Sequence, residues 1–350
     1  MMNIRRSFDT FGMGLIFLVL CLFFWTQSDR FLTPQNFSNL LVQSTVNIII
    51  ATGMTFVICA AEIDLSVGSL LALCGMITAF TLRCDPETGL NLPMSFAGYV
   101  QSALPYLFPG VFGWWLLAGG LFLVISLLPG ILAGLLTGLM VVKFSVPSFI
   151  VTLGLMMIDR GLARYLTNAQ QITGMPLPFM TIGSGWLQIG GRDILPYSVI
   201  IAFSIVIIGA LLLSRSRFGR NILAVGGNIQ ASYLSGVPVN RTRCLAFAVS
   251  GFCVAAASIV QTSRIFIGDP NAGEGYELNA IAAVIIGGAS LFGGKGSVLG
   301  TLFGALIIGV LRNGLDLMGV TDHIKQIVIG AMIVLAVLLD YYRRKLYRSA

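Results

Sequence analysis

The stretch WWLLAGGLFLVISLLPGILAGLLTGLMVV, residues 114–142, contains no charged side chain. A helix needs about 20 apolar residues to cross about 30 Å of hydrocarbon, and this stretch is longer than that. Pro129 lies inside it, and Gly130, Gly134 and Gly138 follow at four-residue spacing. Small residues at that spacing let two helices pack closely in lipid. The stretch therefore predicts a membrane-spanning helix.

The composition of the whole chain leads to the same class. Of its 350 residues, 56% are hydrophobic and 10% are charged, whereas a soluble domain carries about 25% charged residues. So few charges cannot cover the surface of a soluble enzyme, and a disordered chain would be rich in charge. The cysteines form no CxxC pair and His323 is the one histidine, so neither a disulfide framework nor a metal site is predicted. The sequence predicts an integral membrane protein.

The predicted fold class is an all-α polytopic membrane protein with about ten transmembrane helices. The candidate spans are 11–26, 44–61, 66–82, 114–142, 147–166, 195–213, 244–262, 277–291, 297–314 and 324–341. Basic residues collect on the cytoplasmic side of membrane proteins. With the N-terminus inside, about twice as many of the 21 Lys and Arg residues fall inside as outside, which predicts cytoplasmic N- and C-termini. The net charge of +7 follows from this rule and is not a nucleic-acid footprint.

The ten spans divide into two sets of five, which leaves two explanations open. GILAGLLTG (130–138) in the first set resembles GTLFGALIIG (300–309) in the second. Odd-numbered units repeated in tandem are inverted relative to each other, so an inverted five-helix repeat is one explanation. Small residues at this spacing are also common in membrane helices. The whole chain, 1–350, is expected to be a single transmembrane domain with its longest inside loop at 214–243.

Motifs for catalysis are missing from the sequence. A phosphate-cradling GxxxxGK[ST] loop is absent: in the nearest stretch, Ala289 stands in place of the first glycine and Gly296 in place of the hydroxyl residue. Neither GxSxG nor HExxH occurs. The chain is therefore not expected to be an enzyme or to bind a cofactor, and a transporter or channel is predicted.

Carboxylates at membrane depth are few. Ion-coupled transporters usually carry such groups, and here they are Glu62, Asp64 and Asp159. Asp159 is followed by Arg160, and Arg164 lies five residues on. This spacing favours local compensation of the Asp159 charge over a proton-binding site.

The inside loop 214–243 contains a short helix with predicted ends. Asn228 can cap its N-terminus by accepting a backbone N–H. Gly236 suits the left-handed position at its C-terminus, and Pro238 prevents continuation. Ile229, Tyr233 and Leu234 share one face that is too small to form a core of its own. The face is expected either to rest on the membrane surface or to dock into a groove of another protein.

This loop resembles the cytoplasmic coupling loop of the permease subunits of ABC importers, in particular the ribose-type branch that takes up monosaccharides. The resemblance rests on five blocks in order that cover about 40 to 320: IDLSVGS (63–69), PSFIVTLG (147–154) with Arg160-Gly161, RN (220–221) through GGN (226–228), Ala231 and SGV (235–237), AVIIGGASLFGGKG (283–296), and NGLDL (313–317). One departure is Glu62, where the family commonly has glycine. Glu62 is expected to be an interfacial residue rather than a substrate contact.

The resemblance implies roles for three groups of residues. The coupling helix of the family inserts into a cleft of a cytoplasmic ATPase subunit, which here implies contacts by Arg220, Gly227, Asn228, Ala231, Leu234 and Gly236. The broken helix and the translocation path are expected to include Asp64, Ser66, Ser69 and Asn47, although Asp64 and Ser66 suit a simple helix cap equally well. Polar residues of the predicted outer face, where a periplasmic binding protein would dock, are Asp269, Glu274 and Asn313.

The resemblance therefore implies a multi-pass permease of the bacterial inner membrane for a monosaccharide of the ribose, allose, xylose, galactose and inositol class. Its expected partners are a separate ATPase subunit that binds ATP and Mg²⁺, a sugar-binding protein, a second permease copy or paralogue, and membrane lipid, with no nucleic acid. A permease for branched-chain amino acids or nucleosides is the first alternative. An ion-coupled secondary transporter or channel is the second.

Overall fold

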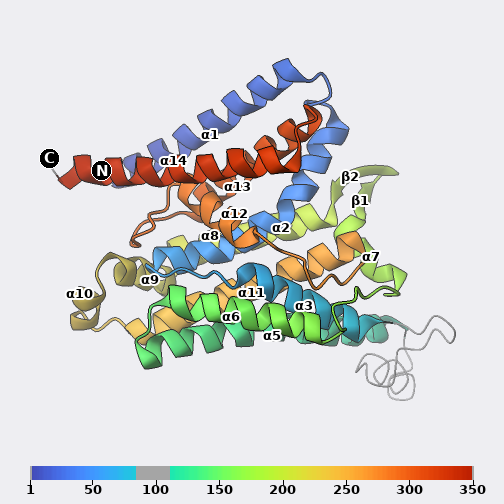
Figure 1. Cartoon of the computed structure of the whole chain (residues 1–350), viewed down its shortest axis with the longest axis horizontal. Coiled ribbons are helices and arrows are strands. Elements are labelled where there is room, and N and C mark those ends of the chain that lie inside the picture. The colour runs from blue at the N-terminus through green and yellow to red at the C-terminus, as the bar shows by residue number, and fades with distance from the viewer. Residues whose placement is uncertain (1, 84–110, 349–350) are drawn as a thin grey trace.

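The computed structural model describes residues 2–83 and 111–348, and most of these lie in helices (Figure 1). The long helices are α1 (Met2–Gln27), α2 (Pro34–Cys59), α3 (Val67–Leu82), α5 (Val111–Phe144), α6 (Ser148–Tyr165), α8 (Tyr197–Arg215), α11 (Val239–Ile265), α13 (Val298–Leu317) and α14 (Asp322–Arg348). Shorter helices are α7 (Leu177–Ser184), α9 (Arg217–Gly227), α10 (Ile229–Leu234) and α12 (Tyr276–Ile286). Every predicted span overlaps one of these helices.

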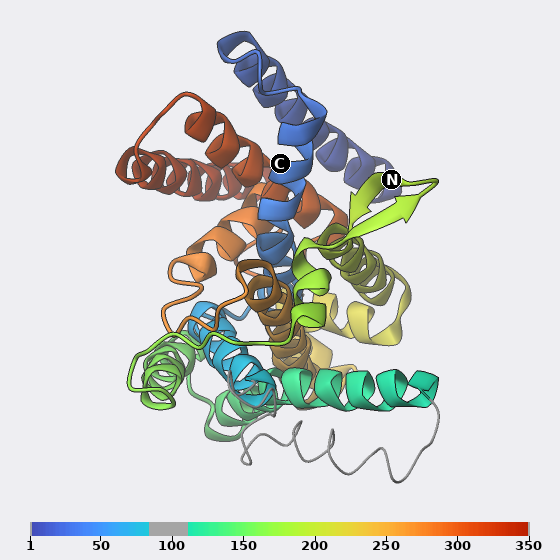
Figure 2. The same ribbon diagram turned by 90° about the vertical axis from the view of Figure 1, so that its right-hand side faces the viewer.

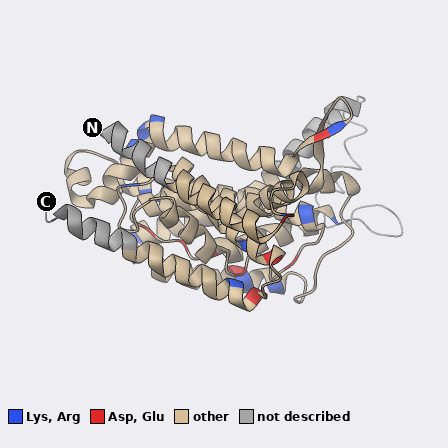
Figure 3. Cartoon of the chain, turned by 90° about the horizontal axis from the view of Figure 1, so that it is seen from above, with Lys and Arg blue, Asp and Glu red and all other residues tan. Residues whose placement is uncertain are grey.

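The apolar lengths of the helices identify a multi-pass membrane protein. Among the residues whose side chains are described, five helices are long and apolar enough to cross a membrane: Pro34–Cys59, Val124–Phe144, Tyr197–Arg215, Val239–Ile265 and Val298–Leu317. Charged positions along the helices are sparse, as Figure 3 shows.

Helix α11 lies at the centre of the bundle. It packs against α5, α2, α3 and α7, and its residues Phe247, Val254 and Val260 are almost fully buried. Seen from the end that carries the strands, α5 and α6 lie on one side of α11, and α1, α13 and α14 on the other (Figure 2). The apolar core runs along α2 from Val46 to Cys59 and along α11 from Ala246 to Val260.

The two glycine stripes allow backbone contact between helices. A side chain at Gly130 or Gly134 would collide with the carbonyl oxygen of Gly251 or Phe247 in α11. A side chain at Gly304 would likewise collide with the carbonyl oxygen of Ala283 in α12. Close approach without side chains is how helices gain packing contacts in lipid, so both stripes have this structural role.

Helix α12 is shorter than the predicted span 277–291. It ends at Ile286 because Gly287 and Gly288 follow, and Gly288 has a φ of +84°. Its 11 residues extend about 16 Å, roughly half of the hydrocarbon thickness. The chain reaches α12 through a segment of turns, 266–275, in which Gly273 packs against Gly68 at the start of α3.

A β-hairpin departs from the all-α prediction. Strands β1 (Trp186–Ile189) and β2 (Arg192–Pro196) pair antiparallel, with Trp186 opposite Pro196. Gly190 and Gly191 connect them with φ values of +61° and +75°. Two positive φ values are what a two-residue hairpin turn requires, so the Gly-Gly pair was the sequence signal for this element.

The bundle has two distinct ends. One carries α10 together with the first turn of α1 and the last turn of α14, and is called the α10 end (Figure 1). The opposite one carries β1 and β2 and is called the hairpin end.

Candidate coupling site and helix break

Helix α10 has the ends that the sequence predicts. The side chain of Asn228 accepts a hydrogen bond of 2.9 Å from the backbone N–H of Ala231, which satisfies a donor of the first turn. Gly236 has a φ of +77°, and its N–H donates to the carbonyl of Tyr233. The predicted cap at Asn228 and the predicted left-handed glycine are both confirmed.

The apolar face of α10 is open. Ile229, Tyr233 and Leu234 are 42%, 74% and 85% exposed. Burying such side chains stabilises a complex by about 1.5–3 kcal/mol each when fully covered. The face therefore offers a binding surface that the described part of the chain does not cover.

The residues predicted to contact an ATPase subunit lie together on this loop. Arg220 comes from α9, a helix that the sequence analysis did not predict although Ser216 caps it by accepting from the N–H of Gly219. The polar pattern Ser216-Arg217 to Arg220 before an apolar run was the available signal. All the predicted contact residues are exposed: Arg220, Gly227, Asn228, Ala231, Leu234 and Gly236.

Helix α9 is attached to the end of α2 through backbone contacts. A side chain at Gly226 would collide with the carbonyl oxygen of Cys59. That same oxygen accepts a hydrogen bond of 3.0 Å from the N–H of Gly294, in the turn before α13. Gly293, with a φ of +80°, packs against Ala61. The loop that carries α10, the end of α2 and the 293–294 turn thus form one closely packed unit.

The chain turns sharply at the end of α2. Ala61 adopts a φ of +63°, its N–H donates to the carbonyl of Ile58, and the N–H of Glu62 donates to that of Val57. This pair of bonds is a Schellman motif, which usually places glycine at the left-handed position. It ends α2 and directs the side chain of Glu62 away from the axis of the helix.

The side chain of Glu62 is paired with Arg243 in the first turns of α11. Oε1 of Glu62 lies 2.5 Å from both Nε and Nη2 of Arg243. Glu62 is 5% exposed. The carboxylate is therefore buried and neutralised by a side chain far away in the sequence, a partner that no local pattern could indicate.

Asp64 organises the break between α2 and α3. Its Oδ1 accepts hydrogen bonds from the backbone N–H and the hydroxyl of Ser66, at 3.0 and 2.6 Å, and its Oδ2 accepts from Ser250 at 3.3 Å. Asp64, Ser66 and Ser69 are all less than 4% exposed. A cap at the membrane surface would be exposed, so these residues instead fix a buried turn.

Asn47 lies apart from that turn. It is in α2, twelve residues before Cys59, and a helix rises about 18 Å over that length. Its side-chain oxygen is buried and accepts no hydrogen bond from the residues that the structure describes. The neighbouring hydroxyls are occupied, because Thr52 donates to Ile48 and Thr55 shares a hydrogen bond with Thr301. The structure thus groups Asp64, Ser66 and Ser69 but not Asn47.

The charge of Asp159 is not compensated as the spacing suggested. Asp159 is 6% exposed, and it forms no ion pair with the side chains that the structure describes, those of 13–83 and 124–338. Arg160 instead donates to the carbonyls of Pro270 and Ala272, at 3.0 and 2.8 Å, and Arg164 to the side chain of Asn271. Both arginines therefore hold the segment of turns before α12.

The residues predicted to dock a binding protein lie in the segment before α12 and in α13. Glu274 is exposed and Asp269 is half-buried, with its carboxylate accepting from the N–H of Asn271. Asn313 is 5% exposed, and its amide exchanges two hydrogen bonds, of 2.9 and 3.1 Å, with the amide of Asn36. Asn313 is thus buried where this pair closes α13 onto α2, and it does not share an exposed surface with Glu274.

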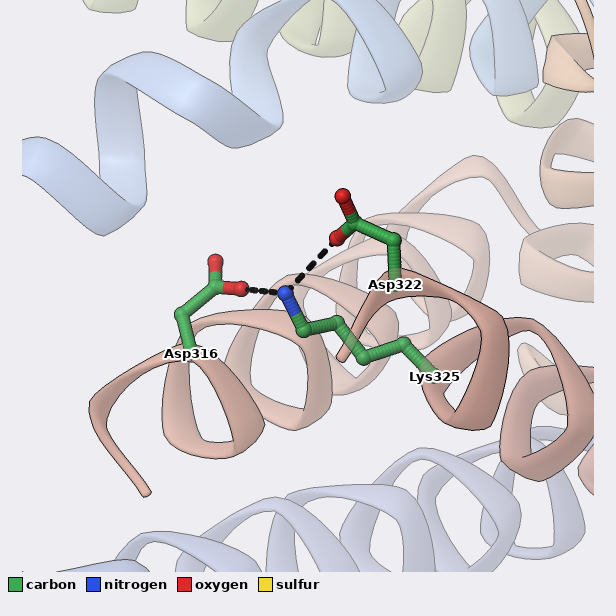
Figure 4. Close-up of polar contacts among 3 residues, drawn as sticks. All are labelled: Asp316, Asp322 and Lys325. Atoms are coloured by element: carbon green, nitrogen blue, oxygen red, sulfur yellow. Dashed lines mark hydrogen bonds and ion pairs between the residues drawn. The ribbon is translucent and has the colours of Figure 1, made fainter. Parts of the chain in front are cut away.

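An exposed charge cluster follows Asn313. The ammonium of Lys325 lies between the carboxylates of Asp316 and Asp322 and bonds to both (Figure 4). No three His, Cys, Asp or Glu side chains gather to hold a metal ion within the described residues.

Long apolar helices, a capped helix with an open apolar face and a broken helix define the chain as a membrane transport permease. The chain belongs to the family described as "Branched-chain amino acid transport system / permease component", whose model matches residues 36–337.

Individual relatives cover nearly the whole chain. The ribose import permease protein RbsC of Escherichia coli K12 is 39% identical over 92% of this chain and 91% of the relative. RbsC of Bacillus subtilis 168 is 37% identical over 94% of this chain and 91% of its own length. The xylose transport system permease protein XylH of E. coli K12 is 33% identical over 93% and 89%. No solved structure matches the chain.

Proposed function

We propose that this chain is the permease subunit of an ABC-type importer and forms the path of a monosaccharide across the bacterial inner membrane. The observation that carries the proposal is α10, a capped helix whose apolar face is open and whose loop is fixed to the end of α2. A surface of this kind suits a groove in another protein. A displacement of α10 by that protein would then be transmitted directly to the transmembrane helices.

A sugar is favoured over an amino acid as the substrate. The description of the family names branched-chain amino acids, but the individual relatives are a ribose and a xylose permease that align over about nine-tenths of their lengths. The substrate class is therefore a neutral monosaccharide of the ribose, allose, xylose, galactose and inositol group. A branched-chain amino acid or nucleoside is the alternative.

Energy would come from a separate subunit. The chain lacks a phosphate-cradling loop, so ATP and Mg²⁺ would be bound by a cytoplasmic ATPase subunit that contacts α10. A sugar-binding protein would dock at the hairpin end near Asp269 and Glu274, and a second permease copy or paralogue would complete the path. The helix break, which includes Asp64, Ser66 and Ser69, would move together with α10.

The position of an ATPase subunit at α10 would also determine on which side of the membrane the termini lie. If α10 faces the cytoplasm, both termini do as well, because the ends of α1 and α14 lie at the α10 end. The ten predicted spans would make residues 1–350 one transmembrane domain, arranged as an inverted pair of five-helix sets.

The test is co-purification of the tagged, detergent-solubilised chain with an ABC-type ATPase subunit that is identified by mass spectrometry and hydrolyses ATP in the complex. We expect Ala231→Arg to abolish recovery of the ATPase, since a charged side chain would enter the groove. Asn240→Arg, at an exposed position of the next helix, is the matched control and should retain it. Failure of the folded wild-type chain to bind any ATPase would favour an ion-coupled transporter, to be tested by uptake under an ion gradient.

A further inference from the structure

The ion pair of Glu62 and Arg243 joins the segment after α2 to the first turns of α11. Glu62 is the second residue after the C-cap of α2 and stands two residues before Asp64. Arg243 is the fifth residue of α11, which begins five residues after α10 ends. The pair thus bridges the broken helix and the helix that directly follows the coupling loop.

Both side chains are withdrawn from water. The side chain of Glu62 is 6% exposed and that of Arg243 is 18% exposed, and both short contacts converge on Oε1. A charged hydrogen bond of this geometry is directional and about twice as strong as a neutral one. Removing one partner leaves a buried charge without compensation, which is far more costly than removing both.

The backbone contacts around the pair explain what it adds. Gly226 and Gly294 hold α9 and the turn before α13 against Cys59, at the end of α2. These contacts stop at Ala61, before the break itself. Beyond that point, Glu62 links the break to α11 through Arg243, and Asp64 links it again through Ser250, about two turns further along α11.

We propose that Glu62 and Arg243 are positioning residues that couple movement of the α10 loop to the break at 62–66. The proposal rests on the proposed function, in which a partner subunit moves α10. When the α10 loop moves, the first turns of α11 move with it. Because Arg243 in these turns is paired with Glu62, the backbone at Glu62 moves as well, and Asp64 follows. Without the pair, α10 would still bind its partner, but the break would follow the loop less closely.

The test uses the permease reconstituted in liposomes with its ATPase subunit and binding protein, with D-ribose as the probe. The measured quantity is the ratio of sugar taken up to ATP hydrolysed. The variants are Glu62→Gln, Arg243→Gln, the double variant Glu62→Gln/Arg243→Gln, and Arg243→Lys. Arg241→Gln is the matched control, because Arg241 is an exposed cation two residues before Arg243 in the same helix.

We expect the double variant to bind the ATPase subunit and to melt close to the wild-type temperature, since it buries no unpaired charge. Its uptake per ATP should fall about tenfold, which lies within the range for mutations that alter coupling between sites. Arg243→Lys keeps the charge and should recover part of the ratio, and Arg241→Gln should leave the ratio unchanged. The single Gln variants should be less stable than the double variant.

A double variant that is stable and transports with the wild-type ratio would overturn the proposal, because the pair would then be structural only. A reduced ratio in Arg241→Gln of the same size would overturn it as well. Failure of the proposed function is distinguishable: the wild-type chain would then bind no ATPase subunit or take up neither D-ribose nor D-xylose, whatever the variants do.

Discussion

The α10 end and the hairpin end of the bundle are held together by different kinds of contact. At the α10 end, backbone meets backbone: Gly226 and Gly294 lie against Cys59, and the pair of Glu62 and Arg243 is buried beside them. Where α13 meets the first turn of α2 at the hairpin end, side chains make the contact instead, through the amides of Asn36 and Asn313.

This difference determines how each end can move. Backbone contacts without side chains leave no rotamer that could relax, so the segments at the α10 end have to move together. Amide pairs and exposed charges can break and exchange with water at a cost of about 1 kcal/mol each. The segments around Cys59 are thus suited to transmit a displacement, and the contact between Asn36 and Asn313 is suited to open.

The largest effect is expected from Gly226→Ala. The added methyl group would collide with the carbonyl oxygen of Cys59 and lies close to the N–H of Gly294, so neither neighbour can give way by changing a rotamer. We expect a loss of at least about 3 kcal/mol or failure to fold, measured as the melting temperature in detergent. Gly227→Ala is the control, because no atom lies within 4 Å of the position of its added carbon. Equal stability of the two variants would contradict the close contact at the α10 end.

The sequence predicted the helical spans and α10 because both have local causes. Apolar length defines a span, and the Asn228 cap and the Gly236 turn define α10 within nine residues. Two further elements also had local signals in the sequence. The capping residue Ser216 indicates the start of α9, and the Gly190-Gly191 pair indicates a hairpin turn.

The side-chain partners could not be predicted, because they lie far apart in the sequence. Glu62 pairs with Arg243 and Asn313 with Asn36, at separations of 181 and 277 residues. Adjacent residues misled instead: Arg160 follows Asp159, but successive residues of a helix point in different directions, and Arg160 binds the carbonyls of Pro270 and Ala272.

An intermediate effect is expected at the amide pair of the hairpin end. Asn313→Ala should cost about 1–2 kcal/mol, because it removes both hydrogen bonds between the amides and leaves the Asn36 amide only its bond to the carbonyl of Phe31. The double variant Asn36→Ala/Asn313→Ala should lose less than the sum of the two single variants, since contacting residues are not additive. Thermal unfolding of all four proteins in detergent measures this. Strict additivity would show that the two amides do not interact.

The smallest effect is expected from Lys325→Met. Lys325 bonds to Asp316 and Asp322, whose side chains are 41% and 87% exposed. Water and salt compete with such pairs, and many of them contribute nothing measurable to stability. The melting temperatures of Lys325→Met and the wild-type chain should therefore agree, and any difference at low salt should vanish at high salt because the Debye length shrinks. A loss that equals that of Asn313→Ala and persists in high salt would mean that this cluster, and not the amide pair, closes the hairpin end.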